Sequence, residues 1–137
     1  MKPDVRSSSA TVQITVTPDM AASLDGRVIH PLYATFWLAY HAEVVARKAI
    51  EPFFEDGENA VGAGLQLEHR GMCPIGASVT VTARVVDYTD NRIVCSILAR
   101  TTQTEIARGT QTQIVLPATT IADKVARAYA MHGLPLP

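Results

Sequence analysis

Alternating apolar and polar residues mark five stretches of the chain as candidate β-strands. The first is Ala10–Thr17, and the other four follow residue 60: Val61–His69, Ser78–Tyr88, Arg92–Thr101 and Glu105–Leu116. The last three are connected by Asp90-Asn91 and Thr102–Thr104, whose residues are typical of hairpin turns. We therefore expect the four later strands to pair as an antiparallel meander.

Two other stretches favour helices. Tyr33–Ile50 is long, rich in Ala and apolar, which indicates a buried helix. It must stop near Glu51, because Pro52 cannot continue a helix. Thr119–His132 is a second candidate helix, with Thr119 or Thr120 as its cap and Gly133 as its end.

The remaining segments carry no regular pattern. We expect Pro18–Pro31 to be irregular and Glu55–Asn59 to form a turn or loop. The order is then strand, long helix and four strands, which is an α+β arrangement of one buried helix against one curved antiparallel sheet. That is the arrangement of the hotdog fold, in which the sheet wraps around the helix. Residues 1–137 are expected to form a single domain, with a core at about 10–117 and a C-terminal helix and tail at 118–137.

Composition and charge limit the classes of function that are expected for this chain. The chain has 137 residues, 47% hydrophobic content, a mean hydropathy of +0.12 and a net charge of −1. The apolar excess fits an oligomer interface or a generous core, and an unpaired edge strand favours dimerisation. No basic cluster suggests nucleic acid.

The cysteines and the N-terminal segment indicate the cellular location of the protein and whether it binds a metal ion. Cys73 and Cys95 are far apart and show no metal-binding spacing, and Cys95 fits a buried free thiol. Met1–Ser9 is polar and lacks the apolar core of a signal peptide, and no run reaches membrane-spanning length. We expect a cytoplasmic protein that has no membrane segment and no metal site.

Thr35, Glu43 and His69 supply a hydroxyl, a carboxylate and an imidazole, which together can hydrolyse an activated acyl group. Thr35 and Glu43 are eight residues apart in the predicted helix. At about 100° per residue they lie roughly 80° apart around the axis and can face one cleft. Whether His69 joins them depends on the fold.

Each of these residues also has an ordinary structural interpretation. Thr35 could be only a helix cap, and His69 could be a surface residue at a strand end. Glu43 lies in a stretch too apolar for a solvated face, and because an unpaired buried carboxylate is costly, this position favours a functional role. His41 is expected to be a core or interface histidine on another face of the helix.

The stretch from His30 to Gly76 resembles the fluoroacetyl-CoA thioesterase type of hotdog protein. The family pattern has Ala-Thr at the helix start, Glu eight residues later, Gly before the next strand, His at that strand's end and then a Pro-x-Gly turn. Here those places are held by Ala34-Thr35, Glu43, Gly62, His69 and Pro74–Gly76.

The resemblance implies a hydrolase of acyl-CoA thioesters that is a homodimer, or a tetramer built from it, with Thr35, Glu43 and His69 as catalytic residues. It needs no cofactor, because CoA arrives as part of the substrate. Residues that would contact the substrate are His30, Tyr33, Phe36 and Gly62. Fluoroacetyl specificity is not implied: the segment Gly26–Leu32 lacks the Phe of that family's aromatic lid, so a different or broader acyl group is expected.

Two other functions compete with this one. Asp25 and His30 have the Asp-x-x-x-x-His spacing of hotdog hydratases and dehydratases, although that family's Asn-Pro element is missing between them. A non-catalytic acyl-CoA-binding module is the other alternative. Such regulators usually add a DNA-binding segment, for which the short N-terminal stretch leaves no room.

Overall fold

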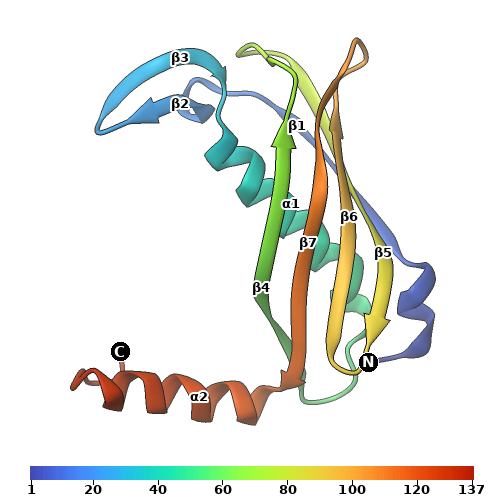
Figure 1. Ribbon diagram of the computed structural model, residues 1–137, viewed down its shortest axis with the longest axis vertical. Coiled ribbons are helices and arrows are strands. Elements are labelled where there is room, and N and C mark those ends of the chain that lie inside the picture. The colour runs from blue at the N-terminus through green and yellow to red at the C-terminus, as the bar shows by residue number, and fades with distance from the viewer.

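Five long strands form one antiparallel sheet that curves around a single helix in this computed structural model, which describes residues 1–137 (Figure 1). The strand order is β1-β5-β6-β7-β4. The bounds of these strands are Ser9–Thr15 for β1, Glu58–His69 for β4, Ser78–Thr89 for β5, Arg92–Arg100 for β6 and Glu105–Pro117 for β7. The central helix α1 spans Thr35–Ile50.

The core lies between α1 and the concave face of the sheet. Every second residue is buried there along β6 and along β5 from Val79 to Val85, with Val81 opposite Ala99 and Ala83 opposite Ile97 across the ladder. On α1 the buried residues recur at helical spacing: Leu38, His41, Ala42, Val45, Ala46, Ala49 and Ile50. The predicted α+β hotdog architecture is confirmed, and so is the buried free thiol of Cys95.

Helix α1 begins two residues later than predicted. Tyr33 is the last residue of a strand, and Ala34 is still extended, with φ −72° and ψ 144°. The C-terminal end is as predicted, because a short 3₁₀ turn over Glu51–Phe53 follows Ile50 and contains Pro52. Two further 3₁₀ turns span Pro3–Ser7 and Pro18–Met20.

The predicted meander is correct for β5, β6 and β7 and wrong for β4. Strand β4 pairs with β7, from Glu58 opposite Pro117 to His69 opposite Ala107, and it does not pair with β5, its successor in sequence. Strand β1 takes the place beside β5. The sheet therefore has free edges at β1 and at β4, and β4 is the longer of the two.

The prediction of an irregular Pro18–Pro31 segment is wrong. Strands β2 (Ala21–Leu24) and β3 (Arg27–Tyr33) form a hairpin that arches away from the main sheet (Figure 1). Its two-residue turn is Asp25-Gly26, and both residues have positive φ, at 51° and 73°. This is the dihedral requirement of a type I′ turn, which Asp-Gly satisfies well.

Helix α2 spans Ala118–Met131, and Gly133 follows it with a φ of +66°, as the predicted end requires. The expected threonine cap is wrong, because Pro117 holds the cap position and no side chain caps the helix. None of the residues of α2 is buried. No helix of the structure has the length and apolar character needed to cross a membrane.

Candidate active site

The structure brings Thr35 and His69 together. Thr35 is the first residue of α1 and His69 the last residue of β4, and the Thr35 Oγ1 to His69 Nδ1 distance is 2.8 Å. The hydroxyl donates to Nδ1 when the imidazole carries its proton on Nε2. In that tautomer the Nε2–H group remains free to donate a hydrogen bond to a ligand.

Both residues line one pocket of about 260 Å³ where β3, α1 and the end of β4 meet. The β3 end of this pocket is anchored by the backbone, since the Tyr33 amide donates to the Cys73 carbonyl at 2.8 Å and Leu32 bridges to Pro74. The full lining is Ala22, His30, Leu32, Tyr33, Ala34, Thr35, His69, Arg70, Gly71 and Met72.

Tyr33 lines this pocket, but its hydroxyl is committed elsewhere. The side chain is 2% exposed, and its hydroxyl shares a hydrogen bond of 2.6 Å with His41 Nδ1 while the two rings stack. Burial raises the pKa of Tyr33 and lowers the pKa of His41, so the pair is a neutral phenol and a neutral imidazole. His41 is thus a core histidine, one of the two roles predicted for it.

Glu43 lies two helical turns beyond Thr35, which is about 12 Å along the axis. Its carboxylate sits against Gly62 of β4, so closely that a Cβ on Gly62 would overlap Glu43 Oε1 and lie 3.2 Å from Cδ. Glu43 borders two further pockets, of about 460 Å³ and about 250 Å³, each of which also includes Gly62. It does not line the Thr35–His69 pocket.

The inference that Glu43 is buried is wrong for the single chain, where its side chain is exposed. Its apolar surroundings are real but do not belong to the core. Phe36 is 75% exposed and Tyr40 is 54% exposed on this side of α1, beside the free edge of β4. The single chain therefore leaves an apolar surface around a carboxylate open to water.

The start of α1 offers backbone donors to the Thr35–His69 pocket. The first helical hydrogen bond runs from the Leu38 amide to the Ala34 carbonyl, and no side chain caps the helix. The amides of Thr35, Phe36 and Trp37 precede that bond and have no carbonyl one turn back to pair with. Such a terminus stabilises an oxyanion.

Of the other predicted residues, some line the Thr35–His69 pocket and others do not. His30 lines the Thr35–His69 pocket, whereas the exposed ring of Phe36 lines neither this pocket nor the two that Glu43 borders. Asp25 lies in the turn of the hairpin and does not line the pocket of His30, so the carboxylate–imidazole pair of a hydratase is not assembled. Catalytic and substrate-binding roles remain predictions.

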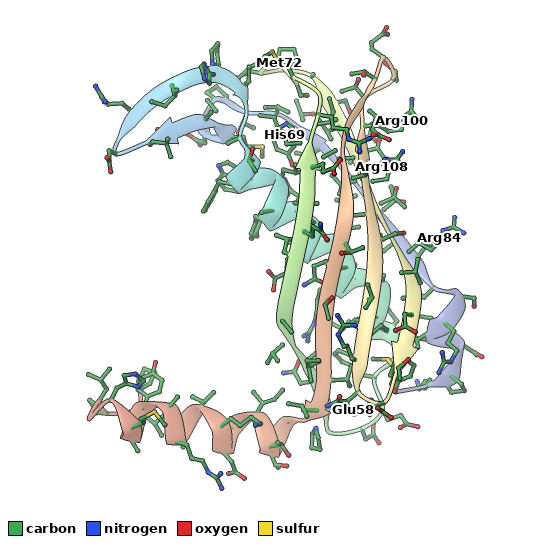
Figure 2. The ribbon with its side chains drawn as sticks, viewed as in Figure 1. Glu58, His69, Met72, Arg84, Arg100 and Arg108 are labelled. Carbon is green, nitrogen blue, oxygen red and sulfur yellow. The ribbon has the colours of Figure 1, made fainter.

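Sequence reasoning missed Arg70 and Met72 as pocket residues. Both follow His69 directly and line the same pocket, and Met72 is 80% exposed at its rim, at the top of the view in Figure 2. Their only signal in the sequence was adjacency to His69. No cluster of three or more His, Cys, Asp or Glu side chains is placed to hold a metal ion.

The architecture and the pocket define a hotdog protein of the thioesterase superfamily. A thioesterase-superfamily protein from Thermus thermophilus superposes with a TM-score of 0.92 at 29% identity, covering 97% of this chain and 98% of that one. The fluoroacetyl-CoA thioesterase FlK superposes with a TM-score of 0.78 at 24% identity, over 88% of this chain and 94% of that one, which supports the fold alone.

Sequence comparison identifies the family. Residues 16–119 match the family described as FlK, fluoroacetyl-CoA-specific thioesterase, so the chain belongs to this family and the predicted resemblance is confirmed. The fluoroacetyl-CoA thioesterase of Streptantibioticus cattleyicolor is 28% identical over 85 residues, which are 62% of this chain and 61% of that protein.

Proposed function

We propose that the protein is an acyl-CoA thioesterase that hydrolyses a small acyl-CoA thioester to the free acid and CoA. The observation that carries the proposal is the Thr35–His69 hydrogen bond at the uncapped start of α1, with Glu43 held against Gly62 on the same helix. Family membership supports thioester hydrolysis. CoA enters as part of the substrate, and no cofactor is needed.

The reaction needs a nucleophile, stabilisation of the carbonyl oxygen and a proton for the departing sulfur. Glu43 acts either as the base that takes a proton from the attacking water, or as the nucleophile that forms an acyl-Glu43 anhydride, which water then hydrolyses to the free acid. As the new C–O bond forms, the carbonyl oxygen gains charge and accepts hydrogen bonds from the amides at the start of α1. The C–S bond then breaks, the Nε2–H group of His69 donates a hydrogen bond to the departing sulfur, and the proton released by water balances the one that the CoA thiolate takes up.

The active form is proposed to be a homodimer, or a tetramer built from it, joined through the free edge of β4. The two free edges of the sheet differ in composition. The exposed side chains of β1 are polar, whereas β4 exposes Val61 and Leu65, and α1 exposes Phe36 and Tyr40 beside it. An apolar edge strand of this length is a site of strand pairing.

Dimerisation accounts for the exposure of Glu43 in the single chain. A second protomer on β4 would cover the two pockets that Glu43 borders, because both are lined by β4 residues. Removing water there strengthens the electrostatic interactions of the carboxylate. Because Glu43 and Thr35 of one chain are about 12 Å apart along α1, the Thr35–His69 pair that acts with Glu43 belongs either to the same protomer or to its partner. Buried, unbonded Cys73 and Cys95 fit the cytoplasmic location that we also propose.

The activity is tested by measuring free CoA release from a panel of short, branched and aryl acyl-CoAs. Glu43→Gln should lower turnover by several orders of magnitude without changing the fold. Glu55→Gln is a matched control away from the pockets that Glu43 borders, since Glu55 pairs with the N-terminal amine, and it should stay within a few-fold of the parent. Tight binding without CoA release from any substrate would make the protein a binding module instead.

The dimer is tested separately by sedimentation. Leu65→Lys places a charge on the proposed interface and should shift the protein towards the 14.8 kDa monomer, with loss of turnover. Thr11→Lys places the same charge on β1 and should change neither property. Dissociation by Thr11→Lys in place of Leu65→Lys would move the interface to the other edge of the sheet.

A further inference from the structure

Helix α2 is amphipathic, and none of its residues is buried within its own chain. Ile121, Val125 and Tyr129 follow one another at four-residue spacing on one face, while Asp123 and Arg127 lie on the opposite face. Val125 is 42% exposed. Ile121 and Tyr129 are half-buried, so the single chain covers the stripe only in part, and an apolar stripe of this kind normally packs against another surface.

Backbone pairing at the start of α2 fixes the direction in which the helix leaves the sheet. The Ala118 amide donates to the Gly57 carbonyl at 2.7 Å, and Pro117 pairs with Glu58 at the start of β4. Helix α2 contacts β4 and β7, and it runs out past the free edge of β4, to the lower left in Figure 1. Its 14 residues extend about 21 Å, a distance that about four neighbouring strands would span.

The opposite end of β4 carries the Thr35–His69 pocket and a second exposed apolar surface. Leu24 and Val28 of the β2–β3 hairpin are 70% and 67% exposed, and Met72 stands at the rim of the pocket. The hairpin lies at the end of the sheet opposite α2, on the same side of β4 (Figure 1).

A two-fold axis through antiparallel β4 strands brings these two surfaces together. In such a pair the Glu58 end of one β4 lies beside the His69 end of its partner. The overhanging α2 of each protomer then reaches the hairpin and pocket rim of the other.

We propose that α2 of each protomer packs its apolar stripe on the partner's β2–β3 hairpin and Met72, and so closes the partner's Thr35–His69 pocket. The proposal rests on the β4-edge dimer proposed above. In this arrangement α2 of one protomer forms a wall of its partner's acyl site. This wall excludes water from the thioester and limits the size of the acyl group. It also gives the interface apolar area that paired backbone alone would lack.

Thiol cross-linking of the full-length protein tests this contact. Val125→Cys is combined in one chain with Met72→Cys or with Val28→Cys, and the protein is treated with a short bis-maleimide. The native Cys73 and Cys95 are buried and give little background. Because residues 125 and 72 lie at opposite ends of the chain's own sheet, the expected product is a covalent dimer of about twice the 14.8 kDa chain mass.

Arg127→Cys in the same two backgrounds is the matched control, since Arg127 lies on the opposite face of α2, and it should give at least about fivefold less covalent dimer. Equal cross-linking from residues 125 and 127 overturns the proposal. A protein that sediments as a dimer but does not cross-link from Val125→Cys overturns the helix contact and leaves the β4 dimer standing. A monomer overturns both.

A kinetic readout completes the test. Val125→Asp should lower kcat/KM about tenfold or more by opening the pocket, while Lys124→Asp, a matched charge on the polar side of the same turn, should change it less than about twofold. Equal effects of the two variants contradict a role of the apolar stripe.

Discussion

Gly62→Ala should displace the Glu43 carboxylate while leaving the stability of the fold almost unchanged. In the structure, a Cβ on Gly62 overlaps Glu43 Oε1, lies 3.2 Å from Cδ and lies 3.6 Å from Oε2. The obstructing atoms belong to the end of a flexible side chain, so the carboxylate can move aside by about an ångström. Free energy of unfolding should change by less than about 1 kcal/mol, because Ala in a strand interior offsets part of the cost.

Catalysis should respond very differently. A displacement of about 1 Å in a reacting group can lower the rate about 100-fold, so Gly62→Ala should lower kcat by about two orders of magnitude. The assay is steady-state CoA release, together with thermal unfolding of the same samples.

Gly64→Ala is the matched control for this experiment. A Cβ on Gly64 meets only Thr112, at 3.6 Å from its Cβ and 3.7 Å from Oγ1, which is ordinary contact. Turnover should therefore stay within a few-fold of the parent. Full activity of Gly62→Ala, or an equal loss from both substitutions, would refute the idea that contact with Gly62 positions Glu43 for the reaction.

Three further predictions concern the buried pair and the hairpin. Tyr33→Phe removes the hydroxyl that is hydrogen-bonded to His41 and should destabilise the fold by about 1–3 kcal/mol in urea melts, a loss that a substitution at exposed Tyr40 should not reproduce. Burial lowers the pKa of His41, so the unfolded chain binds more protons near the ordinary value of 6.5; stability should fall as pH drops through that value, and His41→Gln should flatten this slope. Asp25→Asn should leave CoA release unchanged, because Asp25 lies in the hairpin turn; a loss comparable to that of Glu43→Gln would revive the hydratase geometry.

Local patterns predicted most of the fold because each depends on a few neighbouring residues. Period-two alternation identified β1 and the four later strands, and Pro52 set the end of α1. The pairing of β4 with β7 could not be read from such patterns, because it depends on contacts between residues far apart in sequence. The β2–β3 hairpin was missed for another reason: Asp25-Gly26 is a strong local turn signal that was not used.

The candidate site was predicted in part. The spacing of Thr35 and His69 led to two residues that share a hydrogen bond, whereas Glu43 lies apart from them and exposed to water. Apolar neighbours such as Phe36 and Tyr40 indicate that this part of the helix is buried in the active protein. They do not show whether it is buried in the core of one chain or in an interface between two chains.

The most direct measurement of the central claim is a crystal structure of Glu43→Gln with an unhydrolysed acyl-CoA chosen from the substrate panel. We expect a dimer paired through β4, with the thioester oxygen within hydrogen-bond distance of the amides at the start of α1 and the thioester carbon between residue 43 and His69. An acyl group bound away from the start of α1, or a bound complex in which β4 remains an unpaired edge, would contradict the account.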